Sequence, residues 1–213
     1  MPEIYITLEI GPGGAAAAAA ALEAALKGAQ IASLLIRAPE GCSLDPGIAK
    51  TLVSLAQKRG VASLIASDAN LARMIKADGL HLPWSKDIVK NYREARAELG
   101  EHAMIGSDAG RSRDAAMQLG EAGADYVAFG IPPHVEDRTT AEARQCDLVS
   151  WWSEIFEIPC VAFDAASVAQ AHDLAQAGAD FVVVTVTSAT PASEIERQIA
   201  AFAQTISPAD AVA

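Results

Sequence analysis

One pattern of polar and hydrophobic positions recurs along the chain. Residues 122–130 read AGADYVAFG, residues 177–185 read AGADFVVVT, and residues 75–82, IKADGLHL, are a near match. In each copy a helical stretch ends near an Ala-Asp pair, and an apolar run of strand length follows. Gly123 and Gly178 are expected to end their helices, because the residue just past a helix often needs a positive φ. Uniformly apolar strands are typical of parallel sheets that helices cover on both faces.

The same alternation runs through the whole chain. It predicts strands at residues 4–9, 31–37, 62–66, 79–82, 103–106, 126–130, 160–163 and 181–186. It predicts helices at residues 15–27, 48–59, 86–99, 113–122, 148–156, 167–177 and 192–205, with a further short helix after Asp68. The polar stretch 132–145 is predicted to be a long loop. Repeated βα units of this number predict an α/β fold, a single TIM (β/α)8 barrel over residues 1–206, with a disordered tail at 207–213.

Composition and charge narrow the functional classes. The formal net charge is −11, which disfavours binding to nucleic acid or to an anionic membrane surface. No apolar run reaches the ~18 residues of a membrane span, and the first residues lack the basic start and apolar stretch of a secretion signal. The scattered Cys42, Cys146 and Cys160 are read as reduced thiols. We therefore expect a cytoplasmic protein with a small-molecule ligand; whether it forms a homo-oligomer stays open.

Polar side chains stand at the predicted C-terminal ends of the strands, where barrel enzymes place their reactive groups. These residues are Glu9, Arg37, Ser67, Asp68, His81, Trp84, Ser107, Asp108, Gly130, His134, Asp164, Thr185 and Thr187. Several have a second interpretation: Asp68, Ser107 and Asp164 as helix caps, and His81 as a hydrogen-bonded core residue. Arg37 ends an apolar strand, so its charge needs an anion or a carboxylate as partner.

Four segments carry a resemblance to a known family. They are KADGLHL at 76–82, Ile105-Gly106, GADYVAFG at 123–130 and Gly178–Val182. In order and spacing the chain resembles thiamine phosphate synthase and its relative, the TenI-type thiazole tautomerase, over most of its length. The resemblance implies a barrel that joins hydroxymethylpyrimidine pyrophosphate to thiazole phosphate, releasing pyrophosphate and forming thiamine phosphate.

The resemblance also implies a phosphate site that uses Mg²⁺ and no organic cofactor. Asp68 matches one magnesium carboxylate of the family, whereas Lys86 stands where a second would be, with Asp87 one residue later. Carboxylate oxygens are the ligands that Mg²⁺ prefers. Asp68 and Asp87 are therefore the predicted metal ligands if Mg²⁺ binds.

Other phosphate-binding segments depart from the family pattern. The stretch at the end of the second strand, LIRAP at 35–39, keeps Arg37 of a QLREK-like motif but not its Gln or Lys. The loop after Gly130 lacks the Thr-x-Thr-Lys that holds pyrophosphate, and AFDAA at 162–166 replaces a glycine-rich AIGGI. Glycine there allows close backbone approach to an oxyanion, whereas a carboxylate repels one. The sequence therefore predicts a degenerate phosphate site.

These comparisons assign roles to the strand-end residues. His81, Asp108 and His134 are the predicted acid–base catalysts, and Arg37, Ser107, Gly130 and Asp164 the predicted substrate-binding residues. The predicted pocket is acidic or neutral, lined by Asp68, His81, Asp108 and Asp164. Two alternatives remain: a TenI-like tautomerase or other acid–base enzyme acting on a small molecule, and a non-catalytic binding or scaffold barrel.

Overall fold

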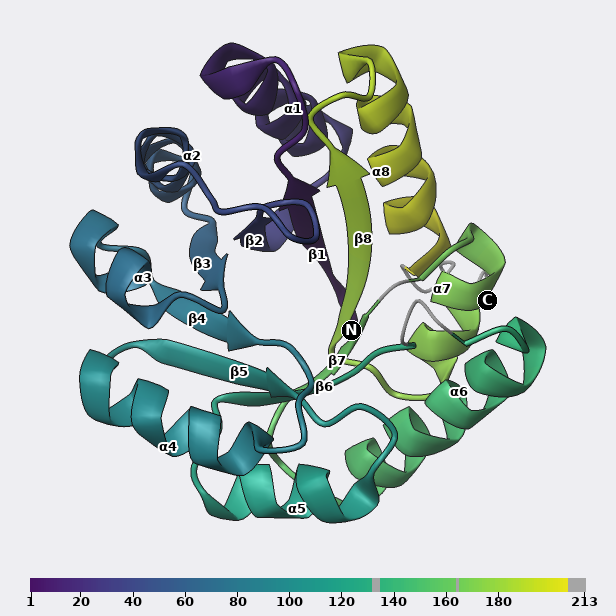
Figure 1. Ribbon diagram of the computed structural model, residues 1–213. Helices are drawn as coiled ribbons and strands as arrows, with labels where there is room; N and C mark the ends of the chain where they lie inside the picture. The colour runs from purple at the N-terminus through teal and green to yellow at the C-terminus, as the bar shows by residue number, and fades with distance from the viewer. Residues whose placement is uncertain (132–134, 164, 207–213) are drawn as a thin grey trace.

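The apolar runs of the sequence form a closed barrel of parallel strands with helices outside it (Figure 1). The computed structural model describes residues 1–131, 135–163 and 165–206. Within these residues eight strands pair in sequence order, and β8 closes the barrel against β1. Figure 1 shows α1 and α8 side by side, so that the first and last helices complete the outer ring.

The strands are β1 (Glu3–Glu9), β2 (Ile31–Arg37), β3 (Ala62–Ala66), β4 (Gly79–Leu82), β5 (Met104–Asp108), β6 (Tyr126–Phe129), β7 (Cys160–Ala162) and β8 (Phe181–Thr187). The helices are α1 (Gly14–Gly28), α2 (Pro46–Lys58), α3 (Ala69–Ile75), α4 (Ile88–Leu99), α5 (Arg113–Glu121), α6 (Arg138–Ile155), α7 (Val168–Gln176) and α8 (Ala192–Ile206). The predicted fold class is confirmed.

Alternation along the strands creates two separate cores. Side chains that point outward pack against the helices and form one large cluster, to which Ile6, Leu8 and Ile105 belong. Side chains that point inward fill the barrel itself. The inner cluster consists of Tyr5, Leu35, Leu64, Tyr126, Ala128, Val161, Phe163 and Val183. The side of the strand on which a residue lies therefore decides whether it can face a ligand in the barrel.

The recurring sequence pattern builds the N-terminal end of the barrel. Gly123 and Gly178 have φ of +90° and +100°, which confirms that each ends its helix in the left-handed region. In the third copy Lys76 takes the same role with φ of +57°. In all three copies the Asp carboxylate accepts a hydrogen bond from the backbone of the preceding strand. These bonds run from Ser63 N–H to Asp78 (2.8 Å), from Ile105 N–H to Asp125 (2.7 Å) and from Cys160 N–H to Asp180 (2.8 Å).

One predicted loop is wrong. Residues 138–145, predicted as part of a long irregular segment, are the first two turns of α6. Asp137 caps this helix by accepting a hydrogen bond from Thr140 N–H at 3.0 Å. Ala141 and Gln145 then lie four residues apart on its buried face, so tertiary packing favours the helix in a polar sequence. The predicted tail, 207–213, lies outside the described residues.

Among the described residues no helix combines the length and the apolar character needed to cross a bilayer.

Candidate functional site

The C-terminal mouth of the barrel carries an ion pair between β1 and β2. Glu9 and Arg37 are paired in register as the last residues of their strands, and Arg37 Nη2 lies 3.2 Å from Glu9 Oε2. Both side chains are about one-third exposed. The partner that the sequence requires for Arg37 is therefore a carboxylate of the protein itself. The two opposite charges make this part of the mouth close to neutral.

One layer deeper, two threonine hydroxyls point into the barrel. Thr7 is fully buried, and it lies between Ile6 and Leu8, which both face the helices. Thr7 pairs in register with Thr185 of β8. Within the described chain, Thr7 Oγ1, Thr185 Oγ1 and Arg37 Nε are buried without a hydrogen-bond partner. Such atoms are rare in folded proteins, because each costs about 1–3 kcal/mol of desolvation.

His81 of β4 lies in the aromatic centre of the barrel. Its ring stacks on Phe163 with centroids 4.5 Å apart, and its Nδ1 shares a hydrogen bond of 2.8 Å with the Tyr126 hydroxyl. The Tyr126 and Tyr5 hydroxyls share another, at 3.1 Å. Gly106 makes room for this arrangement, since a Cβ there would overlap the ring of Tyr126. The interpretation of His81 as a hydrogen-bonded core residue is thereby supported.

This environment changes the protonation of all three groups. Burial, and to a lesser extent the nearby positive charge of Arg37, lowers the pKa of His81 to about 3. Burial also raises the pKa of Tyr5 and Tyr126 well above the ordinary value of a phenol. At neutral pH the three side chains therefore form an uncharged, hydrogen-bonded plug beneath the mouth. The predicted role of His81 as an acid–base catalyst stays a prediction.

The other predicted residues of β5 and β6 lie on different sides of the barrel wall. Asp108 ends β5 and accepts a hydrogen bond from Gly110 N–H at 2.6 Å, and its charge contributes to the raised pKa of Tyr126. Ser107 is fully buried and shares the helix-facing side of β5 with Ile105. Gly130 is buried directly after β6. The substrate-binding roles of Ser107 and Gly130 remain untested.

Two predicted residues, His134 and Asp164, lie outside the described residues. The catalytic role predicted for His134 and the substrate-binding role predicted for Asp164 therefore stay predictions. The described part of the mouth is therefore built from Glu9, Arg37 and Asp108, with Thr185 and His81 below them.

The predicted metal carboxylates are both at helix starts. Asp68 caps α3 by accepting a hydrogen bond from Leu71 N–H at 2.8 Å, as one of its two interpretations predicted. Asp87 is exposed at the N-cap of α4. Among the described residues, no three His, Cys, Asp or Glu side chains gather where they could hold a metal ion. Mg²⁺ is usually held by one or two carboxylates together with waters and substrate phosphates, so Asp68 and Asp87 stay the predicted metal ligands.

Two glutamines missed by the sequence interpretation fix the ends of β6 and β7. Gln145 of α6 donates from Nε2 to the carbonyls of Phe129 at 2.8 Å and Phe163 at 2.7 Å. The Oε1 atom of Gln145 accepts a hydrogen bond from Gln170 Nε2 at 3.1 Å. Gln170 Oε1 in turn accepts one from Ala166 N–H at 2.8 Å. Both amides are buried. The spacing Ala141, Gln145, Leu148, Trp152 is a helical stripe that could have revealed the first of them.

The loops after β7 and β8 often form the phosphate site of TIM barrels through backbone N–H groups. Here four of these donors are already used inside the protein. They are Ala166 N–H to Gln170 Oε1 (2.8 Å), Ser188 N–H to Glu9 O (3.0 Å), Ala189 N–H to Thr187 Oγ1 (3.4 Å) and Thr190 N–H to Thr187 O (3.0 Å). The sequence predicts that the glycine-rich phosphate-binding segment is lost at 162–166. In the structure the N–H groups named above make hydrogen bonds within the protein.

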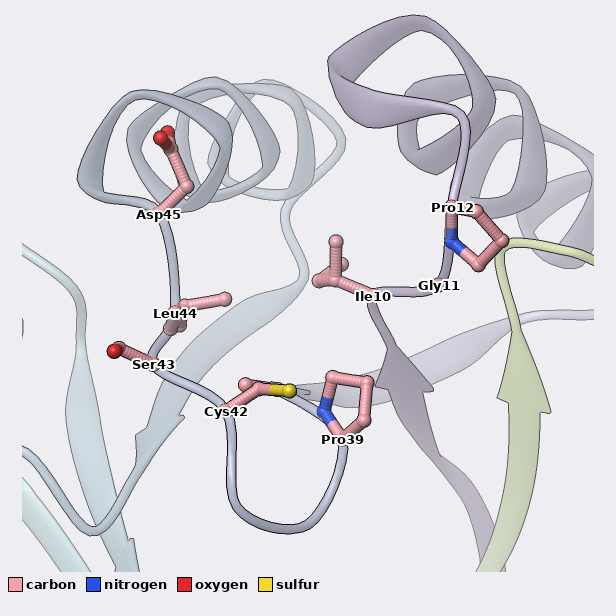
Figure 2. Close-up of a pocket in the computed structure, with 9 residues that line it drawn as sticks. Ile10, Gly11, Pro12, Pro39, Cys42, Ser43, Leu44 and Asp45 are labelled. Atoms are coloured by element: carbon pink, nitrogen blue, oxygen red, sulfur yellow. The ribbon is translucent and has the colours of Figure 1, made fainter.

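A cavity of about 290 Å³ lies beside the mouth, between the loops that follow β1 and β2 (Figure 2). It begins at Ile10 and Ala38, the residues directly after Glu9 and Arg37. The lining residues are Ile10, Gly11, Pro12, Ala38, Pro39, Cys42, Ser43, Leu44 and Asp45. Most of these are apolar, and the volume is at the lower end for small-molecule pockets.

Comparisons with known proteins agree with this architecture. Residues 5–187 match the family model of thiamine monophosphate synthase. The thiamine-phosphate synthase of Erythrobacter litoralis is 38% identical over 164 residues, covering 76% of this chain and 75% of that protein. That of Rhodospirillum centenum is 38% identical over 169 residues, covering 76% and 78%.

Solved structures show the same fold at lower identity. Thiamine phosphate pyrophosphorylase from Pyrococcus furiosus superimposes with a TM-score of 0.72 at 18% identity, covering 95% of each chain. Tryptophan synthase from Mycobacterium tuberculosis gives 0.71 at 16% identity, covering 96% of this chain and 93% of that one. With the family model matching most of its length, the chain belongs to the thiamine monophosphate synthase family.

Proposed function

We propose that this chain binds a small molecule at the mouth of its barrel and forms thiamine phosphate far more slowly than an ordinary synthase, or not at all. The ligand is expected to be related to the thiamine precursors of the family. The protein is proposed to use no organic cofactor. Asp68 and Asp87 are the carboxylates that would hold Mg²⁺ if it binds.

The proposal rests mainly on one observation: backbone N–H groups after β7 and β8 are hydrogen-bonded within the protein. Release of pyrophosphate develops negative charge that must meet preorganised donors and cations. Ala166, Ser188, Ala189 and Thr190 each give their N–H to an internal acceptor. Freeing one of them would require breaking a bond that the fold already makes.

The charges at the mouth support the same conclusion. Arg37, the basic residue that the family motif retains, is paired with Glu9 at 3.2 Å. Below it, His81 is held neutral by burial and so adds no positive charge at neutral pH. An entering pyrophosphate would have to compete with Glu9 for Arg37. These features favour an uncharged or weakly charged ligand over a pyrophosphate.

The cysteines and the net charge support a proposal about the cellular location and the partners of the protein. Cys42, Cys146 and Cys160 are free cysteines, of which Cys42 is exposed, and disulfides are rare in cytosolic proteins. The net charge of −11 favours neither nucleic acid nor an anionic membrane as partner. We therefore propose a cytoplasmic protein whose principal partner is a small molecule.

Two measurements test the proposal. Isothermal titration with pyrophosphate, with and without Mg²⁺, is expected to give no binding in the micromolar range. An assay of the purified chain with hydroxymethylpyrimidine pyrophosphate, thiazole phosphate and Mg²⁺ is expected to give little or no thiamine phosphate. Turnover equal to that of the Erythrobacter litoralis relative, measured in parallel, would overturn it.

A further inference from the structure

Two neighbouring helices of the outer ring, α5 and α6, carry large hydrophobic side chains that stay exposed (Figure 1). Ile155, the last residue of α6, is 62% exposed, and Met117 of α5 is 38% exposed. Both lie on a surface between the two helices, because positions 113 and 117 are one turn apart on α5 and positions 144, 151 and 155 share one side of α6. We call this surface the α5–α6 face; its residues are Arg113, Met117, Arg144, Trp151, Glu154 and Ile155.

Trp151 is held in a fixed position on this face. Its ring makes edge contacts with the rings of Trp152 and Phe156, with centroids 5.8 and 5.4 Å apart. The guanidinium of Arg113 lies over the same ring, 4.8 Å from its centroid. A side chain that is already ordered loses little conformational entropy when a partner covers it. Trp and Arg are also enriched among the residues that carry the binding energy of protein interfaces, so the α5–α6 face suits a protein partner.

Charged side chains of opposite sign gather at the two ends of the face. Each helix begins at the C-terminal mouth of the barrel, and at that end Arg144 lies beside Arg111, whose carbonyl accepts a hydrogen bond from Arg144 Nη2 at 3.4 Å. Arg113 is the third arginine there. The opposite end is acidic, with three exposed residues: Glu121, Glu154 and Glu157. In residues 1–131, 135–163 and 165–206 none of these six side chains forms an ion pair.

A second copy of the chain complements both ends at once. Arg144 and Glu154 are separated along α6 by about 15 Å, at 1.5 Å of rise per residue. A two-fold axis near Trp151 therefore brings Arg144 of each copy to Glu154 of the other. Asp114 and Asp147 offset only part of the charge at the basic end. Because the whole chain carries a net charge of −11, two copies repel each other in most orientations, and matching of opposite ends favours this one.

We propose that two copies of the chain associate through their α5–α6 faces as a two-fold symmetric dimer. Met117, Trp151 and Ile155 form the apolar centre of the interface, and the basic end of each face pairs with the acidic end of the other. Glu9, Arg37 and Asp108 of the barrel mouth are not part of this face. The dimer therefore goes beyond the proposed function and does not depend on it.

Sedimentation equilibrium of the purified full chain, from micromolar to millimolar concentration, tests the association. The mass is expected to rise to twice that of one chain. Ile155→Asp places a charge at the apolar centre and should raise the dissociation constant at least about tenfold. Met74→Asp is the matched control, because Met74 is 61% exposed on α3, away from the face, and it should leave the constant unchanged. A monomer at every concentration, or an unchanged constant in Ile155→Asp, would overturn the inference.

Exchange of charges tests the two-fold arrangement. Arg144→Glu and Glu154→Arg each place like charges across the axis, so each variant alone should dimerise at least about fivefold more weakly than the native chain. An equimolar mixture of the two variants restores opposite charges at both contacts and should dimerise about as well as the native chain. Circular dichroism checks that both variants are folded. A mixture that associates no better than the single variants would show that Arg144 and Glu154 do not meet across the interface, and would overturn the inference.

Discussion

The two ends of the barrel use polar groups in opposite ways. At the N-terminal end Asp78, Asp125 and Asp180 each accept a backbone hydrogen bond from the preceding strand, so polar atoms join neighbouring strands. At the C-terminal end Thr7, Thr185 and Arg37 keep buried atoms without partners in the described residues. A hydrogen bond between a partly buried backbone donor and a carboxylate stabilises the fold, whereas a buried polar atom without a partner is retained at a cost. The difference separates the end that holds the barrel together from the end that is available for a ligand.

The loops at the C-terminal end refine this contrast. After β7 and β8 the backbone donors are bonded internally, through Gln170, Glu9 and Thr187. The unpaired side-chain atoms lie inside the barrel, on β1, β2 and β8. We call the loops after β7 and β8 the closed half of the mouth, because their described backbone donors are bonded internally where many TIM barrels bind phosphate.

The largest expected effect concerns catalysis at the closed half of the mouth. Thiamine phosphate formation should be roughly 10³-fold slower than in an ordinary synthase, since loss of one donor to the leaving group costs ~2.7–4 kcal/mol and each 1.4 kcal/mol is about tenfold in rate. Several donors are missing, but their losses do not add simply. Single-turnover assays with saturating substrates and Mg²⁺ measure the rate. A rate within tenfold of a family relative would show that the closed half still binds pyrophosphate.

The second-largest effect is expected for stability, at the N-terminal end of the barrel. Asp180→Ala removes the acceptor of Cys160 N–H, which should lower the free energy of unfolding by about 1–3 kcal/mol, because a partly buried backbone donor loses its charged acceptor. For a chain of this size that corresponds to roughly 2–4 °C in Tm for each kcal/mol. Calorimetry measures the change. Asp147→Ala, at an exposed position of α6, is the control and should leave Tm nearly unchanged. Equal Tm values for the two variants would contradict a clamping role for the carboxylate.

The plug between the two ends should make stability depend on pH. The unfolded chain protonates His81 near pH 6.5, whereas the folded barrel keeps it neutral down to about pH 3. Unfolding therefore takes up a proton in this window, and stability falls by up to about 1.4 kcal/mol per pH unit as the pH decreases from 6.5. Urea unfolding at several pH values, compared between the native chain and His81→Gln, measures the slope. His102→Gln, on the surface, is the control. An identical slope in His81→Gln would show that His81 is not the source.

The smallest effect compares one hydroxyl from each end. Thr7→Val removes a hydroxyl without a partner in the described residues and should leave stability unchanged or raise it by up to about 1 kcal/mol. Ser63→Ala removes a buried hydroxyl that donates to Asp78 at 2.6 Å, and should lower stability by about 1 kcal/mol. Urea midpoints measured side by side test the pair. If both variants lose the same stability, the Thr7 hydroxyl has a partner within the protein and the contrast between the ends fails.

Much of this molecule follows from local sequence. The strands at 31–37, 62–66 and 79–82 have the bounds predicted from their apolar runs. Gly123 and Gly178 end helices as expected, because the left-handed conformation is a local requirement of the chain. Once parallel βα units are recognised, the strand-end residues must meet at one mouth, and Arg37, His81 and Asp108 lie there. Asp68 caps its helix, which is likewise a short-range interaction.

Contacts between distant residues were decided by the tertiary structure. The start of α6 at Arg138 depends on Gln145 reaching the carbonyls of Phe129 and Phe163, which are brought near only when β6 and β7 pair. Closure of the barrel likewise places Glu9 against Arg37 and buries His81 among aromatic rings. Periodicity determines which side of an element is buried, because it is a property of neighbouring residues. Whether a buried polar atom meets a partner depends on the three-dimensional position of other strands, and that only the folded barrel determines.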